Sequence, residues 1–214
     1  MPKLTRIIKN IGQLFWPFLE GEVKPDTTIY TCEKRMLQEI ENIQDVPLLN
    51  QFASMAEKLY LEEKERLQTV EGKGATFLGT SGFAATLLIW LAQIVVDKSF
   101  FKNDCWFSIM ILTLYIATQV YFLRTIYLSA RCLSRRGYRA IDRRIVLPDS
   151  GINQSQYLKR LAVMYVANYS HNRRVTNEKT DLVALAQENF MRAVICIGVI
   201  GIFFIAQKAF AQLV

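Results

Sequence analysis

The sequence predicts an all-α integral membrane protein with a transmembrane helical hairpin, a third transmembrane helix and cytoplasmic helices. Two uncharged runs, residues 75–96 and 105–123, are separated by a short polar link, and a third apolar run occupies residues 193–206. The segments between them place apolar residues at helical spacing, and the alternating pattern of a strand is nearly absent. An aromatic content of 12% within 51% hydrophobic residues excludes a disordered chain.

The hairpin is the clearest of these elements. Residues 75–96 number 22, which is about 33 Å of helix and enough to cross a hydrocarbon core of roughly 30 Å. Residues 105–123 form a second run of 19 residues, and the link 97–104 carries two acidic and two basic residues. Two spans joined by so short a link predict an antiparallel pair of transmembrane helices.

The third run is shorter, because Gln207 and Lys208 follow its 14 apolar residues. Extension to Val214 gives 22 residues, and the Lys208 ammonium can reach the far headgroups along its aliphatic stem. The sequence therefore predicts a span at 193–214. The alternative is a helix that lies on the membrane or inside a bundle.

Charge is distributed unevenly along the chain, whose formal net charge is +7. Residues 1–74 hold ten Lys and Arg against twelve Asp and Glu, whereas residues 124–192 hold thirteen against five. Positive residues near span ends remain in the cytoplasm, so residues 124–192 and the N-terminal segment are expected there. No secretory signal precedes the first span, since the apolar run 14–19 is short and contains Pro17.

The arginines after the second span form a predicted basic docking patch. Its members are Arg135, Arg136, Arg139, Arg143 and Arg144. One interpretation is that they set topology and contact anionic headgroups. The other is that they bind a partner, with nucleic acid involved only indirectly if at all.

The distribution of charged and apolar residues divides the whole chain into regions. We expect five regions: a basic amphipathic helix and linker at 1–23, a helical stalk at 24–73, the hairpin at 74–130, a basic helical region at 131–192 and the third span at 193–214. Within them, the spacing predicts helices over 27–44, 48–72, 125–144, 155–171 and 178–192. Gly72 and Gly74 leave open whether the stalk helix continues into the membrane or hinges there.

Catalytic and metal-binding patterns are missing from the sequence. His171 is the single histidine, and the four cysteines have no metal-ligand spacing. No nucleotide-binding or hydrolase motif occurs, and the runs 75–96 and 105–123 contain no carboxylate. We therefore expect no enzyme activity, no cofactor and no metal.

Small and polar residues within the first two spans predict close helix packing or a polar path. These residues are Ala75, Gly79, Thr80, Ser81, Gly82, Ala85, Thr86, Gln93 and Gln119. Small residues four apart let membrane helices approach and hydrogen-bond. Packing inside one protomer and self-association of several protomers both satisfy this pattern.

Two stretches resemble a known family. The run Glu65–Gly82, a charged helix ending in Glu-Gly-Lys-Gly-Ala-Thr-Phe-Leu-Gly, resembles the entry to the first span of bacterial SLATT/Pycsar-type transmembrane effectors of antiphage defence systems. A second stretch between Tyr157 and Phe190, which includes Asn168, Asn172 and Asn177-Glu-Lys, is similar to the segment that leads into their apolar run. The third span and the large insert 124–192 depart from the simplest two-span layout.

The resemblance implies a non-enzymatic effector in the bacterial inner membrane, multi-pass with a cytoplasmic N-terminus. Such a protein oligomerises and permeabilises or depolarises the membrane when a cytoplasmic signal arrives. The implied partners are the lipid bilayer, further copies of the chain and a soluble protein encoded nearby. Two alternatives stay open: a membrane scaffold that recruits a soluble defence nuclease or sensor through the basic region, and a small channel or transporter subunit.

Overall fold

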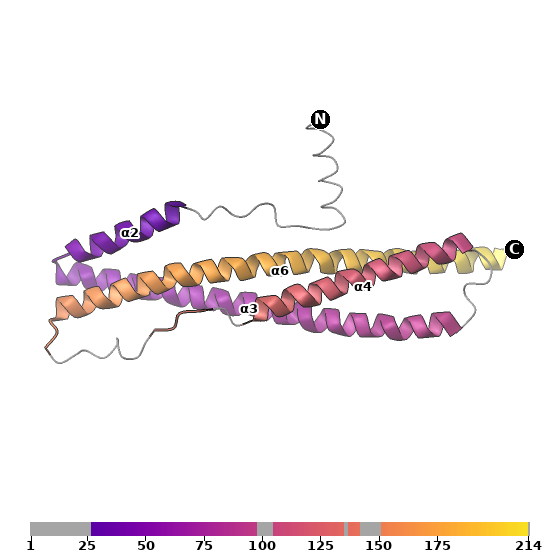
Figure 1. The fold of residues 1–214 in the computed structure, drawn as a ribbon, viewed down its shortest axis with the longest axis horizontal. Coiled ribbons are helices and arrows are strands. Elements are labelled where there is room, and N and C mark those ends of the chain that lie inside the picture. The colour runs from indigo at the N-terminus through magenta and orange to yellow at the C-terminus, as the bar shows by residue number, and fades with distance from the viewer. Residues whose placement is uncertain (1–26, 98–104, 135–136, 142–150, 214) are drawn as a thin grey trace, which may run out of the picture. The chain divides into compact units, whose positions relative to one another are not determined.

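The computed structural model describes residues 27–97, 105–134, 137–141 and 151–213 (Figure 1). This part of the chain contains four α-helices and no strand: α2 (Thr27–Asn42), α3 (Val46–Asp97), α4 (Cys105–Leu133) and α6 (Gln154–Leu213). The all-α prediction is confirmed. The amphipathic helix expected at 3–19 lies outside the described residues.

Helix α3 begins after Asp45 and runs for 52 residues. Pro47 occupies its first turn, where a missing N–H is tolerated, and the Leu49 N–H donates to the Asp45 carbonyl at 3.0 Å. The helix passes through Gly72 and Gly74 without interruption. The sequence left open a continuous helix or a hinge at these glycines, and the structure has the continuous helix.

Helix α6 is a single helix of 60 residues. The sequence predicted two helices separated at 172–177, and this prediction was wrong. The polar side chains there form hydrogen bonds with the backbone of their own helix and do not interrupt it. Thr176 Oγ1 donates to the Asn172 carbonyl at 3.0 Å, and Thr180 Oγ1 donates to the Thr176 carbonyl at 2.8 Å. With neither Gly nor Pro in the segment, nothing ends the helix.

Helix α4 ends at Leu133, whereas the sequence predicted helix as far as Arg144. Ser134 closes the last turn, because its hydroxyl donates to the Arg131 carbonyl at 2.6 Å and its N–H to the Ala130 carbonyl at 3.0 Å. Residues 137–141 are not helical. The prediction was wrong here because the backbone of 137–141 takes its hydrogen bonds from α6, as described below.

The described residues fall into two compact units. Unit 1 comprises residues 72–97, 105–134 and 181–213, and unit 2 comprises residues 27–71, 137–141 and 151–180. In unit 1, the ring of Phe190 on α6 packs against Phe77 of α3 at 5.6 Å and Phe122 of α4 at 6.0 Å between ring centroids. These three aromatic rings tie the three helices of unit 1 together.

Unit 2 packs α2 against the first part of α3 and the first part of α6. Its core contains one buried residue of α2, Ile40, together with residues from α3 and α6 (Leu49, Ala53, Ala56, Tyr60, Leu158, Ala162, Tyr165 and Val166). The rings of Tyr60 and Tyr165 lie 5.8 Å apart and join α3 to α6. Apolar side chains from three helices thus form the core of unit 2.

Two helices in the described chain are long and apolar enough to cross a membrane, at Ser108–Leu133 and Gln154–Ala206. Only 28% of the apolar window of the first and 11% of that of the second is buried, whereas the core helix of a soluble protein is mostly buried. The span expected at 75–96 lies on α3, but the side chains of Leu91 and of 93–97 fall outside the described residues. That span stays a prediction, as does crossing by residues 207–214.

Candidate functional site

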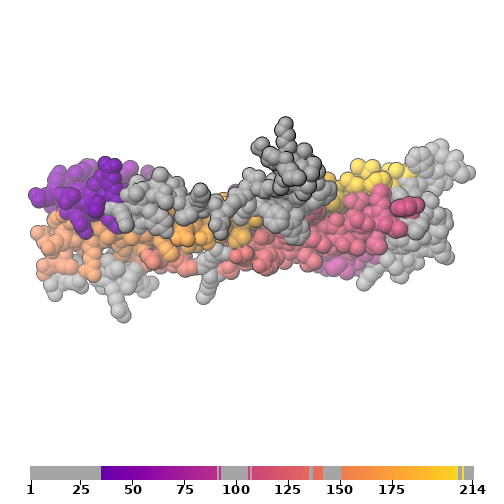
Figure 2. Space-filling view, turned by 45° about the horizontal axis from the view of Figure 1, so that its top comes forward, coloured from indigo at the N-terminus to yellow at the C-terminus, as the bar shows by residue number. Residues whose placement is uncertain are grey.

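Unit 1 has an apolar outer surface and a partly polar interior. Large exposed hydrophobic side chains lie on all three of its helices: Phe83, Leu87, Ile89, Trp90, Trp106, Ile109, Leu112, Ile116, Val120, Leu123, Tyr127, Met191, Val194, Ile195, Ile202 and Ile205. The buried side chains include Ser81, Thr118, Thr125, Ser129 and Asn189. Figure 2 shows α4, coloured rose, contributing to this outer surface. A water-soluble bundle has the opposite distribution.

The buried threonines of α4 are satisfied mainly within their own helix. Thr118 Oγ1 donates to the Leu114 carbonyl at 2.7 Å and Thr125 Oγ1 to the Tyr121 carbonyl at 2.9 Å. The Thr125 hydroxyl also lies 3.4 Å from the Ala186 carbonyl on α6. Such bonds let small polar side chains pack between helices without water.

The predicted packing residues of α3 separate into two groups. Ser81 and Ala85 are buried inside unit 1, whereas Ala75, Gly79, Thr80 and Thr86 are exposed and Gly82 is half-buried. A Cβ added at Gly79 or Gly82 would meet no atom within 4 Å. Residues 75, 79, 82 and 86 follow helical spacing, so one small-residue face points away from the protomer. We call these four residues the small-residue face.

Of the two glutamines predicted within the spans, Gln93 and Gln119, the structure describes the side chain of Gln119 alone. Gln119 is half-buried, and its amide donates to the Tyr115 hydroxyl at 3.3 Å. That hydroxyl in turn donates to the Leu88 carbonyl of α3 at 3.4 Å. The side chain of Gln93 lies outside the described residues. Gln119 therefore takes part in contacts within the protomer.

Of the predicted basic docking patch, only Arg139 is described, and it is exposed. Arg135, Arg136, Arg143 and Arg144 lie outside the described residues. The structure adds that the backbone of Arg139 is held by Asn172 of α6, as donor to Asn172 Oδ1 at 2.9 Å and as acceptor from Asn172 Nδ2 at 3.0 Å. The basic docking patch therefore stays a prediction.

Residues 137–141 form a non-helical strap bound to α6 in unit 2. Besides the two bonds to Asn172, the His171 ring Nε2 lies 2.6 Å from the Gly137 carbonyl. Sequence reasoning missed this role for both residues. The sequence carried no signal for it, because only the structure shows that the Asn172 amide is buried, as Thr176 and Lys179 of the same helix are.

The hydroxyl of Tyr138 on this strap is buried and has no hydrogen-bond partner in the described residues. Burial, with the neighbouring Tyr60 and the carboxylate of Glu63, raises the pKa of Tyr138 well above its usual range. Glu63 is itself only 5% exposed and pairs with Arg66 at 3.6 Å. The Tyr138 phenol of the strap thus lies near the buried carboxylate of Glu63 on α3.

Two further polar links join α3 to α6 at the same end of unit 2. Lys179 Nζ lies 2.5 Å from Glu71 Oε1, and Arg66 Nη2 donates to Asn177 Oδ1 at 2.9 Å. The Lys179 side chain is only 4% exposed, so its charge depends on Glu71 for compensation. These links fix the rotation of one helix against the other in unit 2.

The described residues offer no group of three or more His, Cys, Asp or Glu side chains that can hold a metal ion. Cys132 is buried and Cys196 is half-buried, and both are free thiols. What the fold and these surfaces define is a class: a helical protein with two helices long and apolar enough to cross a membrane. No family model, curated protein or solved structure matches the chain.

Proposed function

We propose that this chain is an integral membrane protein that self-associates in a bacterial inner membrane and permeabilises it on a cytoplasmic signal, as an effector of antiviral defence. The observation that carries the membrane part is the apolar outer surface of unit 1. The resemblance of Glu65–Gly82 to SLATT/Pycsar-type effectors supplies the defence role.

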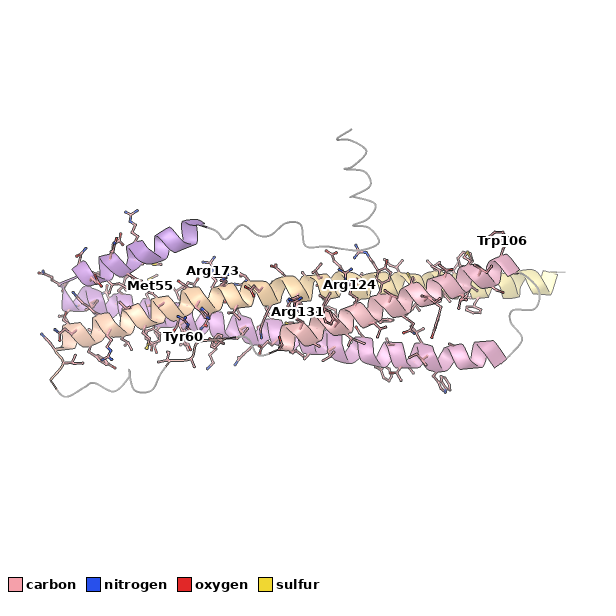
Figure 3. The ribbon with its side chains drawn as sticks, viewed as in Figure 1. Met55, Tyr60, Trp106, Arg124, Arg131 and Arg173 are labelled. Carbon is pink, nitrogen blue, oxygen red and sulfur yellow. The ribbon has the colours of Figure 1, made fainter. Side chains whose placement is uncertain are left out.

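Two side chains of α4, one at its start and one nine residues before its end, support a transmembrane position for it. Trp106 is 87% exposed at the start of the helix, and Arg124 lies eighteen residues further on (Figure 3). Eighteen residues of helix rise about 27 Å, close to the thickness of a hydrocarbon core. Tryptophan favours the interface and arginine the cytoplasmic side. Helix α4 accordingly crosses from an outer interface at Trp106 to an inner one at Arg124.

The small-residue face of α3 supports self-association. A Cβ at Gly79 or Gly82 would meet no atom of the described residues within 4 Å, and glycines so placed let two membrane helices approach closely. The hydroxyl of its one threonine already has a partner in its own helix, because Thr86 Oγ1 donates to the Gly82 carbonyl at 2.9 Å. A second copy of the chain is the occupant that this face suits.

The membrane part is tested by fractionation. The full chain, expressed in bacteria, is expected in the membrane pellet after alkaline carbonate extraction. Recovery in the soluble fraction would reject it.

For self-association, Gly79→Leu and Gly82→Leu are compared with Ala84→Leu by cross-linking in intact membranes. The glycine variants are expected to lose oligomer; equal oligomer in all three would reject this face.

The effector part is tested by membrane potential. Cells carrying the gene with its neighbouring genes are challenged with phage, while a potential-sensitive dye is followed. Depolarisation that precedes lysis, and that is lost in Gly79→Leu, is expected. Protection of the culture without any change in potential would reject permeabilisation.

A further inference from the structure

One face of α4 is buried inside unit 1 and is polar along most of its length. Thr118, Phe122, Thr125 and Ser129 are separated by four, three and four residues, which places them on the same side of the helix. The Phe122 side chain is 1% exposed and the other three are 0% exposed. Helix α4 therefore turns three hydroxyl groups and one aromatic ring toward the other helices of unit 1.

Helices α3 and α6 add buried polar side chains to the same interior. Ser81 of α3 and Asn189 of α6 are both 0% exposed. Asn189 lies one turn after Ala186, whose carbonyl is 3.4 Å from Thr125 Oγ1. Within the described part of the chain, Ser81 Oγ, Ser129 Oγ and Asn189 Oδ1 are buried and have no hydrogen-bond partner. We call these five polar residues, three from α4 and two from its neighbours, the polar interior: Ser81, Thr118, Thr125, Ser129 and Asn189.

The chemistry of the polar interior indicates which solute suits it. A buried oxygen atom without a partner is costly, so these oxygen atoms favour any group that they can contact. Uncharged oxygen atoms can replace the hydration shell of a monovalent cation, as backbone carbonyls do in potassium channels. Among the described residues of unit 1, none of the buried side chains is charged, whereas divalent cations favour carboxylates. A singly charged cation therefore fits this interior best.

Three aromatic rings, one from each helix of unit 1, interrupt the polar interior. Phe122 lies on α4 between Thr118 and Thr125, and its ring centroid is 6.0 Å from that of Phe190 on α6. The Phe190 ring lies in turn 5.6 Å from the ring of Phe77 on α3. We call these three rings the aromatic cluster. An apolar constriction on a polar path excludes water, and channels use this effect to close.

We propose that the polar interior of unit 1 is a path for small monovalent cations and that the aromatic cluster holds this path closed. The inference rests on the membrane position and the permeabilising role in the proposed function, and it names the route that ions take through the chain. Helix packing by itself accounts for threonine hydroxyls that bond within their own helix. It does not account for buried oxygen atoms of Ser81, Ser129 and Asn189 that have no partner in the described residues.

The resting membrane potential of bacteria that express the full chain tests the aromatic cluster without the activating signal. Phe122→Ala removes the central ring and is expected to collapse the potential in the absence of phage, as a potential-sensitive dye reports. Phe83→Ala is the matched control, because the Phe83 ring is 68% exposed on the outer surface of unit 1. A normal potential in cells whose Phe122→Ala protein is membrane-inserted would overturn the proposal.

A second substitution separates conduction through the polar interior from a loosened fold. Thr118→Val keeps the side-chain shape and removes the hydroxyl, so adding it to Phe122→Ala is expected to restore the potential. Thr113→Val is the matched control: Thr113 is exposed on the same helix, and its hydroxyl donates to the Ile109 carbonyl at 2.8 Å, as that of Thr118 does to Leu114 at 2.7 Å. Equal leaks in the two double variants would overturn the path.

Vesicles that contain purified Phe122→Ala protein test the choice of cation. With potassium chloride concentrated inside, a path for monovalent cations is expected to make the interior negative. No potential, or a positive interior, would overturn the cation path. Phe122→Leu keeps aliphatic bulk, is expected to leak in the same direction, and replaces Phe122→Ala in both tests if the alanine variant does not fold.

Membrane fractionation keeps this inference separate from the proposed function on which it rests. Wild-type chain in the soluble fraction would reject both, because a path across the bilayer needs an inserted protein. Inserted Phe122→Ala or Phe122→Leu protein without a leak would reject the path through unit 1 alone, since depolarisation after phage challenge is measured independently on the wild type.

Discussion

Asn172 holds the backbone of Arg139 through both ends of its side-chain amide, accepting from the Arg139 N–H at 2.9 Å and donating to the Arg139 carbonyl at 3.0 Å. A buried residue of α6 thereby gives the strap 137–141 the pairing that a neighbouring strand would give. The strap carries Tyr138, whose hydroxyl is buried near Tyr60 and Glu63, so the attachment of the strap to α6 holds this phenol in its buried position.

Replacement of Asn172 by Ala is expected to destabilise the chain by about 1–3 kcal/mol, because two backbone groups lose their partners in a part-buried site. Thermal melting in detergent, followed by circular dichroism, measures the change. Asn177→Ala on the same helix is the control, since it removes only an exposed bond to Arg66. Equal losses from both variants would mean that the strap contributes nothing specific.

The ion pair of Glu71 with Lys179 predicts an asymmetry. Lys179 is 4% exposed and Glu71 is 38% exposed, so removing the carboxylate strands a buried ammonium, whereas removing the ammonium leaves a carboxylate that water reaches. Glu71→Ala is expected to cost about 2–4 kcal/mol and Lys179→Met less than about 1.5 kcal/mol. The double variant should recover most of the first loss. Equal single losses in melting experiments would contradict this account.

Gly74 predicts a steric coupling to Cys132. A Cβ at Gly74 would lie 3.2 Å from Cys132 Sγ, whereas a Cβ at Gly72 would meet nothing within 4 Å. Gly72→Ala should therefore stabilise the helix by about 0.5–1 kcal/mol, and Gly74→Ala should not. In a Cys132→Ala background, Gly74→Ala should become stabilising. A gain from Gly74→Ala in the wild-type background would show that the cysteine gives way.

The raised pKa of Tyr138 predicts a loss of stability at high pH. The unfolded phenol ionises near its usual pKa of about 10, while the folded one keeps its proton, so the stabilisation is fully present below that pH and is lost as pH rises toward the folded pKa. Tyr138→Phe should flatten this dependence between about pH 9 and 11 in denaturation titrations. Tyr127→Phe, at an exposed position, should leave the slope as it is in wild type.

A charge at the centre of α4 separates a membrane-inserted helix from a water-exposed one. Ile116 is 54% exposed near the midpoint between Trp106 and Arg124, so Ile116→Arg in a bilayer should cost about 2.5–3.5 kcal/mol and lower the membrane-inserted fraction. Leu61 is 47% exposed in unit 2, and Leu61→Arg should leave insertion intact. Normal yield of membrane-inserted Ile116→Arg would count against the transmembrane position of α4.

The sequence alone determined the class and much of the helix layout. The period and length of hydrophobic runs depend only on the local order of residues, so the all-α class could be predicted, as could a helix over 27–44, which the structure has as Thr27–Asn42. Helix α6 shows the limit: its polar stretch Asn172–Asn177 looks like a break, but its side chains bond within the helix and to the strap. A polar residue gives no local sign of which partner it will find.

Tertiary structure alone decided which residues of a pattern face inward. Ser81 and Ala85 belong to the same small-residue pattern as Gly79 and Gly82, yet packing against neighbouring helices buries the first pair, whereas a Cβ at either glycine would meet none of the described residues within 4 Å. Packing also brought Phe190 against Phe77, which lies 113 residues earlier in the chain. Contacts between distant residues depend on helix rotation, which the side chains of several helices set together.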